Sequence, residues 1–416
     1  MKHRHSLVGQ GYMLPFVLIT FFFFLWGFAR AILDVLNPFF QETFQINKTQ
    51  ASLIQFVTYL AYFLMAVPAG MMIRRYGTRK GVVVGLLAFG GAALAFVASR
   101  FFGPYIFRFY LLLLFVIGCG LACLEVAANP YVTLLGDKET AAGRINRAQS
   151  FNGLGCICGS LLGGIYCFSG ENPNISIPYI GIGAIVLVIA VLFSRVRLPE
   201  FVIEDEDSAA RSRPTKGLSA RPLFLFGLFA LFCYEIAEIA INSFFINYAV
   251  ENHMVEWFTD FIATHFGMNL HPKFIASIVL SVGLLLFMLG RFAGSMLMQR
   301  MRAEQVLLGC AIGTVTMTTL VVMDIHGVSF VASILIFVFE SIMFPTIFAL
   351  SIKGLGGLTQ KASAILMMTP IGGAIGTVLM GMAADMHNMT FSFLVPLTAF
   401  AVILIYAVVL LRKKPE

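Results

Sequence analysis

The chain has 416 residues, of which 59% are hydrophobic and only 12% charged, with a formal net charge of +7 and a mean hydropathy of +0.89. A soluble protein of this length cannot bury so much apolar surface, so these values exclude a soluble globular protein. In a membrane protein, a positive net charge is typical of basic cytoplasmic loops and does not indicate nucleic-acid binding. We therefore expect an all-α membrane protein with the lipid bilayer, and no nucleic acid, as a partner.

Twelve apolar runs have the length of about 20 residues that a bilayer-spanning helix needs. They are centred near positions 24, 61, 90, 118, 156, 187, 234, 285, 313, 340, 373 and 402. A polar stretch separates the sixth run from the seventh and has the composition of a linker. We therefore predict twelve transmembrane helices, with a six-helix bundle over residues 1–198, a cytoplasmic linker over 199–221 and a second six-helix bundle over 222–416.

The sequence indicates neither a cleavable signal peptide nor a set of disulfide bonds. The apolar run after the first ten residues is too long for a signal peptide and has no small-residue cleavage site, so we expect no cleavable signal. All seven cysteines lie in apolar runs, and we interpret them as small packing residues. We expect neither a metal site nor a cofactor.

Lysine and arginine are concentrated in alternate loops. If both termini are inside, 22 of the 28 basic residues lie on the cytoplasmic side, while Arg30 and Arg291 lie within helices. The positive-inside rule then sets the orientation. We predict a multi-pass protein of a bacterial inner (plasma) membrane with both termini cytoplasmic. The four basic residues left outside are Lys48, Arg100, Arg108 and Lys273.

The two halves of the chain repeat each other in three places and in the same order. Glu125 and Pro130 match Glu340 and Pro345 at one common offset. Three matches in one order indicate a duplication, and two parallel six-helix repeats are typical of one large class of secondary transporters. The matching segments are Ala69–Gly85 with Ala293–Gly309, Leu124–Gly136 with Phe339–Gly356, and Asn37–Phe40 with Asn242–Phe245.

Polar side chains form stripes on four of the predicted helices, at spacings of three, four or seven residues that place them on one helix face. In lipid, such groups must face the bundle interior or water. The stripes therefore predict a shared wet cavity. They consist of Arg30, Asp34 and Asn37; Glu125 and Asn129; Asn146, Gln149 and Asn152; and Glu235, Glu238 and Asn242.

A proton path through the bilayer would have to use carboxylates. The seven histidines lie in tails, loops or helix ends, and no lysine lies in the middle of a span. Burial favours the protonated form of a carboxyl group and a neighbouring arginine favours the ionised form, so a movable pair can exchange a proton between the two sides. The available groups are Asp34, Glu125, Glu235, Glu238 and Glu340.

Several segments also resemble a known family over nearly the whole chain. The loop GMMIRRYGTRKG is similar to the signature loop of the major facilitator superfamily, with Arg74 at the position that is usually acidic. Five further segments resemble the fucose permease branch, and in them LEVAANP is the most distinctive string. In that branch an asparagine commonly precedes the helix 1 aspartate, where this chain has Leu33. The five segments are Phe23–Phe40, Ala51–Gly70, Gly118–Gly136, Arg144–Gly155 and Ser341–Gly356.

The resemblance implies the major facilitator fold and proton-coupled import of fucose, galactose or glucose by alternating access. Asp34 and Glu125 match the branch's helix 1 aspartate and helix 4 glutamate, so it implies that they couple the proton. L-fucose is our first candidate substrate, and we expect a monomer. The residues expected to bind the sugar are Arg30, Gln55, Asn129, Gln149, Asn152, Glu238 and Asn242.

Other functions remain open at this point. Glucose or galactose is the alternative substrate, and the sequence does not exclude sodium as the coupling ion. An integral membrane enzyme acting on a lipid-linked sugar is an alternative of another class. It would need a larger aqueous domain than the longest outside loop, about Val250 to Pro272, provides. A channel or drug exporter would favour an apolar, less acidic cavity than the polar stripes predict. With these alternatives weighed, we expect a transporter and not an enzyme.

Structural roles for the same residues also remain open. Arg30 and Asp34 would lower each other's insertion cost as a plain ion pair, and Glu125 would serve as a strut between helices. Gln149 and Asn152 are of the type that joins helices through amide hydrogen bonds. Glu235 is expected to be structural or at the cavity edge, and the role of Glu340 is open.

Overall fold

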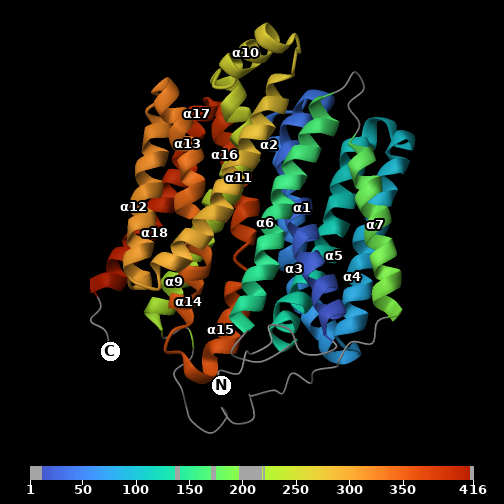
Figure 1. Cartoon of the computed structure of the whole chain (residues 1–416), viewed down its shortest axis with the longest axis vertical. Helices are drawn as coiled ribbons and strands as arrows, with labels where there is room; N and C mark the ends of the chain where they lie inside the picture. The colour runs from blue at the N-terminus through green and yellow to red at the C-terminus, as the bar shows by residue number, and fades with distance from the viewer. Residues whose placement is uncertain (1–11, 136–140, 170–174, 196–217, 219–220, 413–416) are drawn as a thin grey trace, which may run out of the picture. The chain divides into compact units, whose positions relative to one another are not determined.

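The computed structural model describes residues 12–135, 141–169, 175–195, 218 and 221–412. Over these ranges the chain is almost entirely helical, and twelve helical segments are long and apolar enough to cross a membrane. Each predicted centre falls within one of these segments, so the predicted all-α fold of twelve spans is confirmed. Figure 1 shows the long helices running alongside one another within each unit of the chain.

The chain divides into two compact units, which we describe separately. Unit 1 comprises residues 1–45 and 53–201, and unit 2 comprises residues 46–52 and 202–416. Most of the predicted linker 199–221 lies outside the described residues. The long helices of unit 1 are α1 (Met13–Phe44), α3 (Leu53–Tyr76), α4 (Thr78–Ala95), α5 (Ile106–Leu134), α6 (Ala141–Phe168) and α7 (Ser176–Arg195).

Unit 2 contains both long and interrupted helices. Its uninterrupted spans are α9 (Pro222–Glu251), α11 (Pro272–Leu297), α12 (Ala303–Val322) and α18 (Leu394–Arg412), the last following the short α17 (Met389–Ser392). Two spans are broken into α13 (His326–Glu340) with α14 (Met343–Ile352), and α15 (Thr359–Leu366) with α16 (Ile371–Met386). The breaks matter because irregular backbone at membrane depth exposes polar groups that need partners inside the protein.

In unit 1, small residues allow α6 to approach α1 at backbone distance. A Cβ atom at Gly155 would overlap the main-chain oxygen of Phe24, and one at Gly159 would overlap that of Phe28. Glycines four residues apart lie on one helix face, so they open a continuous track for the α1 backbone. This contact fixes α1, which carries most of the candidate site of unit 1.

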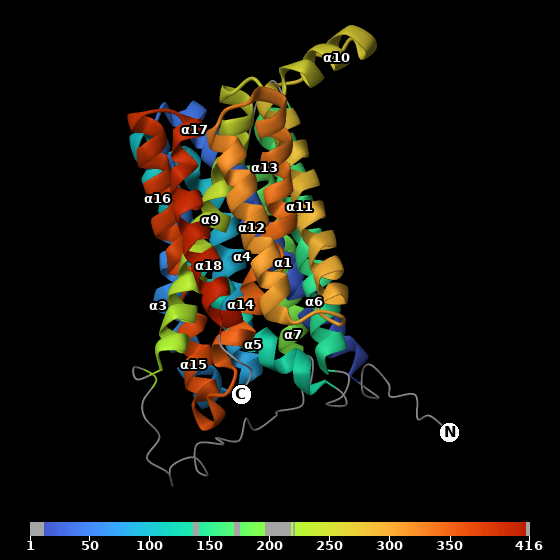
Figure 2. The same cartoon turned by 90° about the vertical axis from the view of Figure 1, so that its left-hand side faces the viewer.

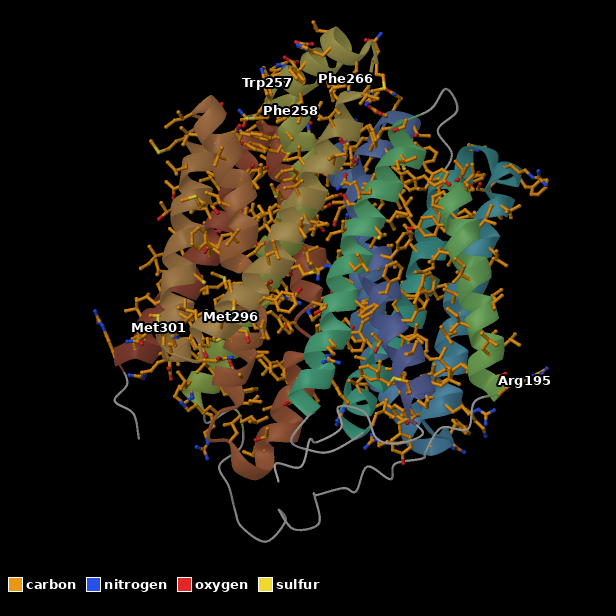
Figure 3. The ribbon with its side chains drawn as sticks, viewed as in Figure 1. Arg195, Trp257, Phe258, Phe266, Met296 and Met301 are labelled. Atoms are coloured by element: carbon orange, nitrogen blue, oxygen red, sulfur yellow. The ribbon has the colours of Figure 1, made fainter. Side chains whose placement is uncertain are left out.

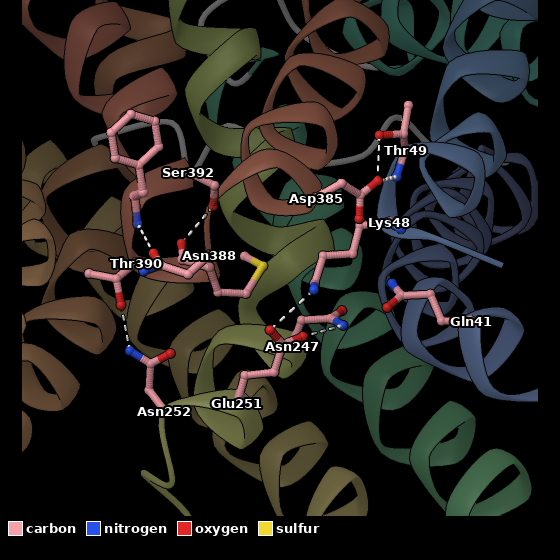
Figure 4. Close-up of polar contacts among 12 residues, drawn as sticks. Gln41, Lys48, Thr49, Asn247, Glu251, Asn252, Asp385, Asn388, Thr390 and Ser392 are labelled. Carbon is pink, nitrogen blue, oxygen red and sulfur yellow. Dashed lines mark hydrogen bonds and ion pairs between the residues drawn. The ribbon is translucent and has the colours of Figure 1, made fainter. Parts of the chain in front are cut away.

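A short segment between α1 and α3 is attached to unit 2. Helix α1 ends at Phe44, and the next residue, Gln45, has a left-handed conformation (φ 50°). Asn47 and Gln50 then form a capping box for α2 (Lys48–Ala51). Asp385 at the end of α16 accepts hydrogen bonds from the main-chain N–H groups of Lys48, at 3.0 Å, and Thr49, at 2.8 Å (Figure 4). We refer to Ile46–Ser52 as the strap. Nothing in the sequence pattern indicated this attachment.

The loop between α9 and α11 contains a further helix, α10 (Glu256–Phe266). Figures 1 and 2 show it beyond the end of α11, and Figure 3 shows Trp257, Phe258 and Phe266 on it. These aromatic side chains, together with Phe261, are exposed. The loop is therefore an amphipathic helix and its connections, where the sequence analysis had described only a loop.

Candidate functional site

The predicted polar stripe on α1 is present in the structure and lies inside unit 1. Asp34 is 4% exposed and Asn37 is fully buried, while Arg30 is half-buried. Asn37 accepts a hydrogen bond from the side chain of Gln41, one turn further on, at 2.6 Å. The helical repeat places all four side chains on neighbouring positions of one face.

Glu125 on α5 completes this group. The charges of Arg30 and Glu125 are close enough to interact. The Tyr62 hydroxyl, from α3, has Glu125, Arg30 and Trp26 among its neighbours. The structure therefore brings together one arginine, one carboxylate and one tyrosine from three helices that lie far apart in the sequence.

The Glu125 side chain also lines a small pocket between α1 and α5. Among its described lining residues, Glu125 is the one ionisable side chain and Trp26 the largest aromatic one. An indole beside a carboxylate suits a sugar, because the ring packs against C–H groups and the carboxylate accepts hydroxyl hydrogens. The pocket is lined by Phe22, Phe23, Trp26, Leu121, Leu124, Glu125 and Ala128.

Only one end of the side-chain amide of Gln55, on α3, forms a hydrogen bond within the described residues. Its Nε2 donates to the main-chain oxygen of Leu33 on α1, at 3.1 Å. Its Oε1 is buried and has no hydrogen-bond partner among the residues that the structure describes. A buried acceptor of this kind is costly unless water or a ligand supplies a donor. The arrangement thus holds Gln55 in place and leaves an acceptor for a hydroxyl group.

The predicted stripe on α6 has a structural contact. Asn152 donates its amide hydrogen to the main-chain oxygen of Phe23 at 3.1 Å, so it joins α6 to α1. Gln149, one turn earlier, is half-buried. The side chains of Asn129 and Asn146 lie outside the described residues. The sugar-binding roles expected for Asn129, Gln149 and Asn152 stay predictions.

Unit 2 holds the second predicted stripe, on α9. Glu235, Glu238 and Asn242 are each at most 5% exposed. The Oδ1 atom of Asn242 has no hydrogen-bond partner in the described part of the chain. Tyr234 adds a hydroxyl to this face and is 1% exposed.

Two residues that the sequence analysis did not place in a site lie beside this stripe. The Tyr234 hydroxyl is close enough to interact electrostatically with Glu340 and Arg291, as well as with Glu238 and Glu235. Glu340 is fully buried at the end of α13. The available signals were that Arg291 is an intramembrane arginine and that Glu340 is the repeat counterpart of Glu125.

A proline explains the position of Arg291. Pro345 in α14 has no N–H group, so it cannot bond the main-chain oxygen of Ser341, four residues earlier. Arg291 Nε donates to this oxygen at 3.1 Å. Its guanidinium also lies over the ring of Phe287, 4.7 Å from the centroid. The break in the helix beside Glu340 leaves this oxygen without its usual helical donor. Arg291 bonds to it and is thereby held close to the acidic residues of α9.

The remaining expectations concern metals and cysteines. Six of the seven cysteines are free thiols: Cys119, Cys123, Cys158, Cys167, Cys233 and Cys310. The described residues contain no group of three or more histidine, cysteine, aspartate or glutamate side chains arranged to hold a metal ion. His253, in the loop between α9 and α11, contacts Glu256 at the start of α10, at 2.5 Å.

Comparison with known proteins gives consistent matches along the chain. The family model described as the Major Facilitator Superfamily matches residues 19–369. The glucose/galactose transporter of Brucella abortus biovar 1 (strain 9-941) is 32% identical over 415 residues, which cover 98% of this chain and 96% of that one. The L-fucose-proton symporter of Escherichia coli (strain K12) is 32% identical over 426 residues, covering 96% and 93%. The crystal structure of the transporter FucP in the outward conformation has a TM-score of 0.68 and 32% identity, covering 97% of this chain and 100% of that one.

Proposed function

Because the chain belongs to the Major Facilitator Superfamily, we propose that it imports a monosaccharide together with a proton by alternating access. L-fucose is the first candidate and glucose or galactose the second. The relatives support this choice, because those named above are a glucose/galactose transporter and an L-fucose-proton symporter. The observation that carries the proposal is the group formed by Trp26, Arg30, Tyr62 and Glu125 in unit 1.

Each member of this group has a task in the proposed cycle. Glu125 binds and releases the proton, because it is ionisable, lines the pocket and lies within electrostatic reach of Arg30. Trp26 packs against the apolar face of the sugar ring. Asp34 shares the coupling with Glu125 and accepts hydrogen bonds from sugar hydroxyl groups. Gln55 Oε1 accepts a further sugar hydroxyl hydrogen. A proton and a sugar would thus bind to adjacent groups of one unit.

The proposed location of the protein follows from its candidate spans and from the distribution of its basic residues. Its twelve candidate spans make it a multi-pass membrane protein. We place it in the bacterial inner membrane as a monomer with both termini in the cytoplasm. This orientation puts the strap and α10 on the outer side.

Tryptophan fluorescence tests sugar binding directly. The chain has two tryptophans, Trp26 in the pocket and Trp257 on α10. In a Trp257→Phe variant, Trp26 is the only indole. We expect its emission to change on addition of the transported sugar and not on addition of an unrelated polyol. A panel of L-fucose, D-galactose, D-glucose and their epimers then ranks the substrates.

Transport in proteoliposomes tests the coupling. We expect sugar uptake to alkalinise a weakly buffered external medium, with one proton entering with each sugar, and to proceed without sodium. Uptake that requires sodium and leaves the external pH unchanged would overturn the proton assignment. A protein that neither binds nor transports any sugar of the panel would overturn the proposed function itself.

A further inference from the structure

The Tyr234 hydroxyl of unit 2 is a buried polar group that has no hydrogen-bond partner in the described part of the chain. The side chain is 1% exposed, within the span formed by α9. Across the described residues, its oxygen makes no hydrogen bond. Buried hydroxyl groups in folded proteins are nearly always paired, so this one points to a partner from outside the chain.

The surroundings of Tyr234 are polar and charged. Glu235 and Glu238 come from its own helix, Glu340 from α13 and Arg291 from α11, and all four are within electrostatic reach of the Tyr234 hydroxyl. An acidic cluster alone would not specify a ligand. The Tyr234 hydroxyl adds this information, because it lies among these groups and has no hydrogen-bond partner in the described chain. A ligand that binds there must therefore offer a hydrogen-bonding group.

The pattern along α9 identifies the kind of ligand. Tyr234, Glu238 and Asn242 are four residues apart and therefore share one helix face. The Tyr234 hydroxyl can donate, the Glu238 carboxylate accepts, and Asn242 Oδ1 is a second buried atom without a partner in the described chain. A row of donor and acceptors one helical turn apart matches a molecule with several hydroxyl groups.

The aromatic ring of Tyr234 is held in place by packing. It lies 6.0 Å from the ring of Phe344 on α14, at a tilt of 54°. A tyrosine has few rotatable bonds, so little conformational entropy is lost when its hydroxyl binds a ligand. The hydroxyl is therefore preorganised for a contact.

We propose that Tyr234 is a specificity-determining residue of this transporter, and that its hydroxyl forms a hydrogen bond with one hydroxyl group of the sugar next to Glu238. The inference rests on the proposed function, because it takes the ligand to be a monosaccharide. It extends that function by giving unit 2 a sugar contact of its own. It also predicts that the loss of one particular hydroxyl group from the sugar removes the effect of Tyr234 on binding.

The variant Tyr234→Phe removes only the hydroxyl and tests the proposal. Binding is measured by Trp26 fluorescence in the Trp257→Phe background, with the transported sugar and each of its monodeoxy analogues. We expect Tyr234→Phe to weaken binding of the parent sugar by about 3- to 10-fold, the range of one neutral hydrogen bond. One deoxy analogue, which lacks the contacted hydroxyl, should bind the variant and the unsubstituted protein equally.

Tyr406→Phe is the matched control. Tyr406 is a fully buried tyrosine of the same unit, but its hydroxyl lies 3.3 Å from Ser351 Oγ. We expect this variant to bind the whole panel normally. Without sugar, Tyr234→Phe should be at least as heat-stable as the parent, because it deletes a polar atom that has no partner. A lower melting temperature for Tyr234→Phe without sugar would show a structural bond and overturn the proposal.

The binding data separate this inference from the proposed function. If the unsubstituted protein binds sugar and Tyr234→Phe binds every member of the panel with unchanged affinity, the inference is wrong and the function stands. The inference is also wrong if all analogues lose affinity by the same factor, since no single hydroxyl is then contacted. If the unsubstituted protein binds no sugar, both are wrong.

Discussion

Asp385 accepts both the main-chain N–H and the hydroxyl group of Thr49, at 2.8 and 2.6 Å. Together with the N–H of Lys48, this gives the carboxylate three donors at the first turn of α2. A carboxylate is favourable there because the N-terminus of a helix presents unpaired N–H groups and a partial positive charge. The last turn of α16 therefore caps α2, the helix within the strap.

Removing the Asp385 carboxylate should loosen the strap. In Asp385→Ala, the N–H groups of Lys48 and Thr49 lose their acceptor, and we expect their hydrogen exchange to become about tenfold faster, which corresponds to the loss of one helix cap. Peptide-level hydrogen exchange by mass spectrometry over residues 44–56 measures this.

Glu251→Gln is the control for the strap. It removes the ion pair between Glu251 and the Lys48 side chain, 3.2 Å apart, and leaves the cap intact. Because this pair is partly exposed and screened, we expect little change in exchange. Equal exchange rates in Asp385→Ala and the parent would show that the cap does not hold the strap.

We expect α10 to lie in the outer headgroup region of the bilayer. Trp257, Phe258, Phe261 and Phe266 are all exposed on this short helix. Aromatic side chains gather at the membrane–water interface, where an apolar ring and a polar edge are both accommodated. In a Trp26→Phe variant, the emission of Trp257 should be blue-shifted and quenched by lipids brominated close to the headgroup. Emission typical of water, with no quenching by these lipids, would place α10 away from the bilayer.

The fold was predictable because its signal is spread over many residues. Twelve long apolar runs specify twelve helices, and the spacing of Arg30, Asp34 and Asn37 specifies one face of α1 whatever the tertiary structure. Single contacts carry no such signal. Both ends of an amide are polar, so the sequence does not show that Gln55 bonds through its Nε2 while its Oε1 has no partner among the described residues.

The same reason explains what was missed in unit 2. An aromatic residue in an apolar run usually packs, so the place of Tyr234 on a helix with a polar stripe is a weak signal without Glu340 and Arg291 beside it. The link between Pro345 and Arg291 depends on a main-chain oxygen, which sequence patterns do not report. The Asp385 cap likewise depends on one residue that belongs to no periodic pattern.

Neutralising Glu125 should separate sugar exchange from proton coupling. Glu125→Gln keeps the size of the side chain and removes its proton, so we expect exchange of sugar between two pools to continue while uphill accumulation is lost. Counterflow and pH-driven uptake in proteoliposomes measure the two activities. Glu256→Gln, at an exposed position of α10, makes the same chemical change and should preserve both. Normal uphill uptake by Glu125→Gln would assign Glu125 a structural role.

The charged pair on α1 can be tested by comparing stability with binding. If Arg30 and Asp34 were only a structural ion pair, Asp34→Asn would leave the half-buried Arg30 without its counter-charge and would lower the folding stability. Arg30, however, also lies within electrostatic reach of Glu125, which remains to balance it. We therefore expect Asp34→Asn to keep a melting temperature in detergent close to that of the parent and to lose sugar binding, as measured by Trp26 fluorescence.

The double variant Arg30→Met, Asp34→Leu completes this test. Apolar replacements of similar size remove both charges and leave neither one unpaired, so the protein should fold well. It should nevertheless transport nothing, because the arginine that acts on Glu125 and the carboxylate of Asp34 are both gone. Asp260→Asn, on the exposed side of α10, makes the same aspartate-to-asparagine change and should alter neither stability nor binding. Sugar binding near the parent level in Asp34→Asn or in the double variant would mean that the two charges only hold α1 in place.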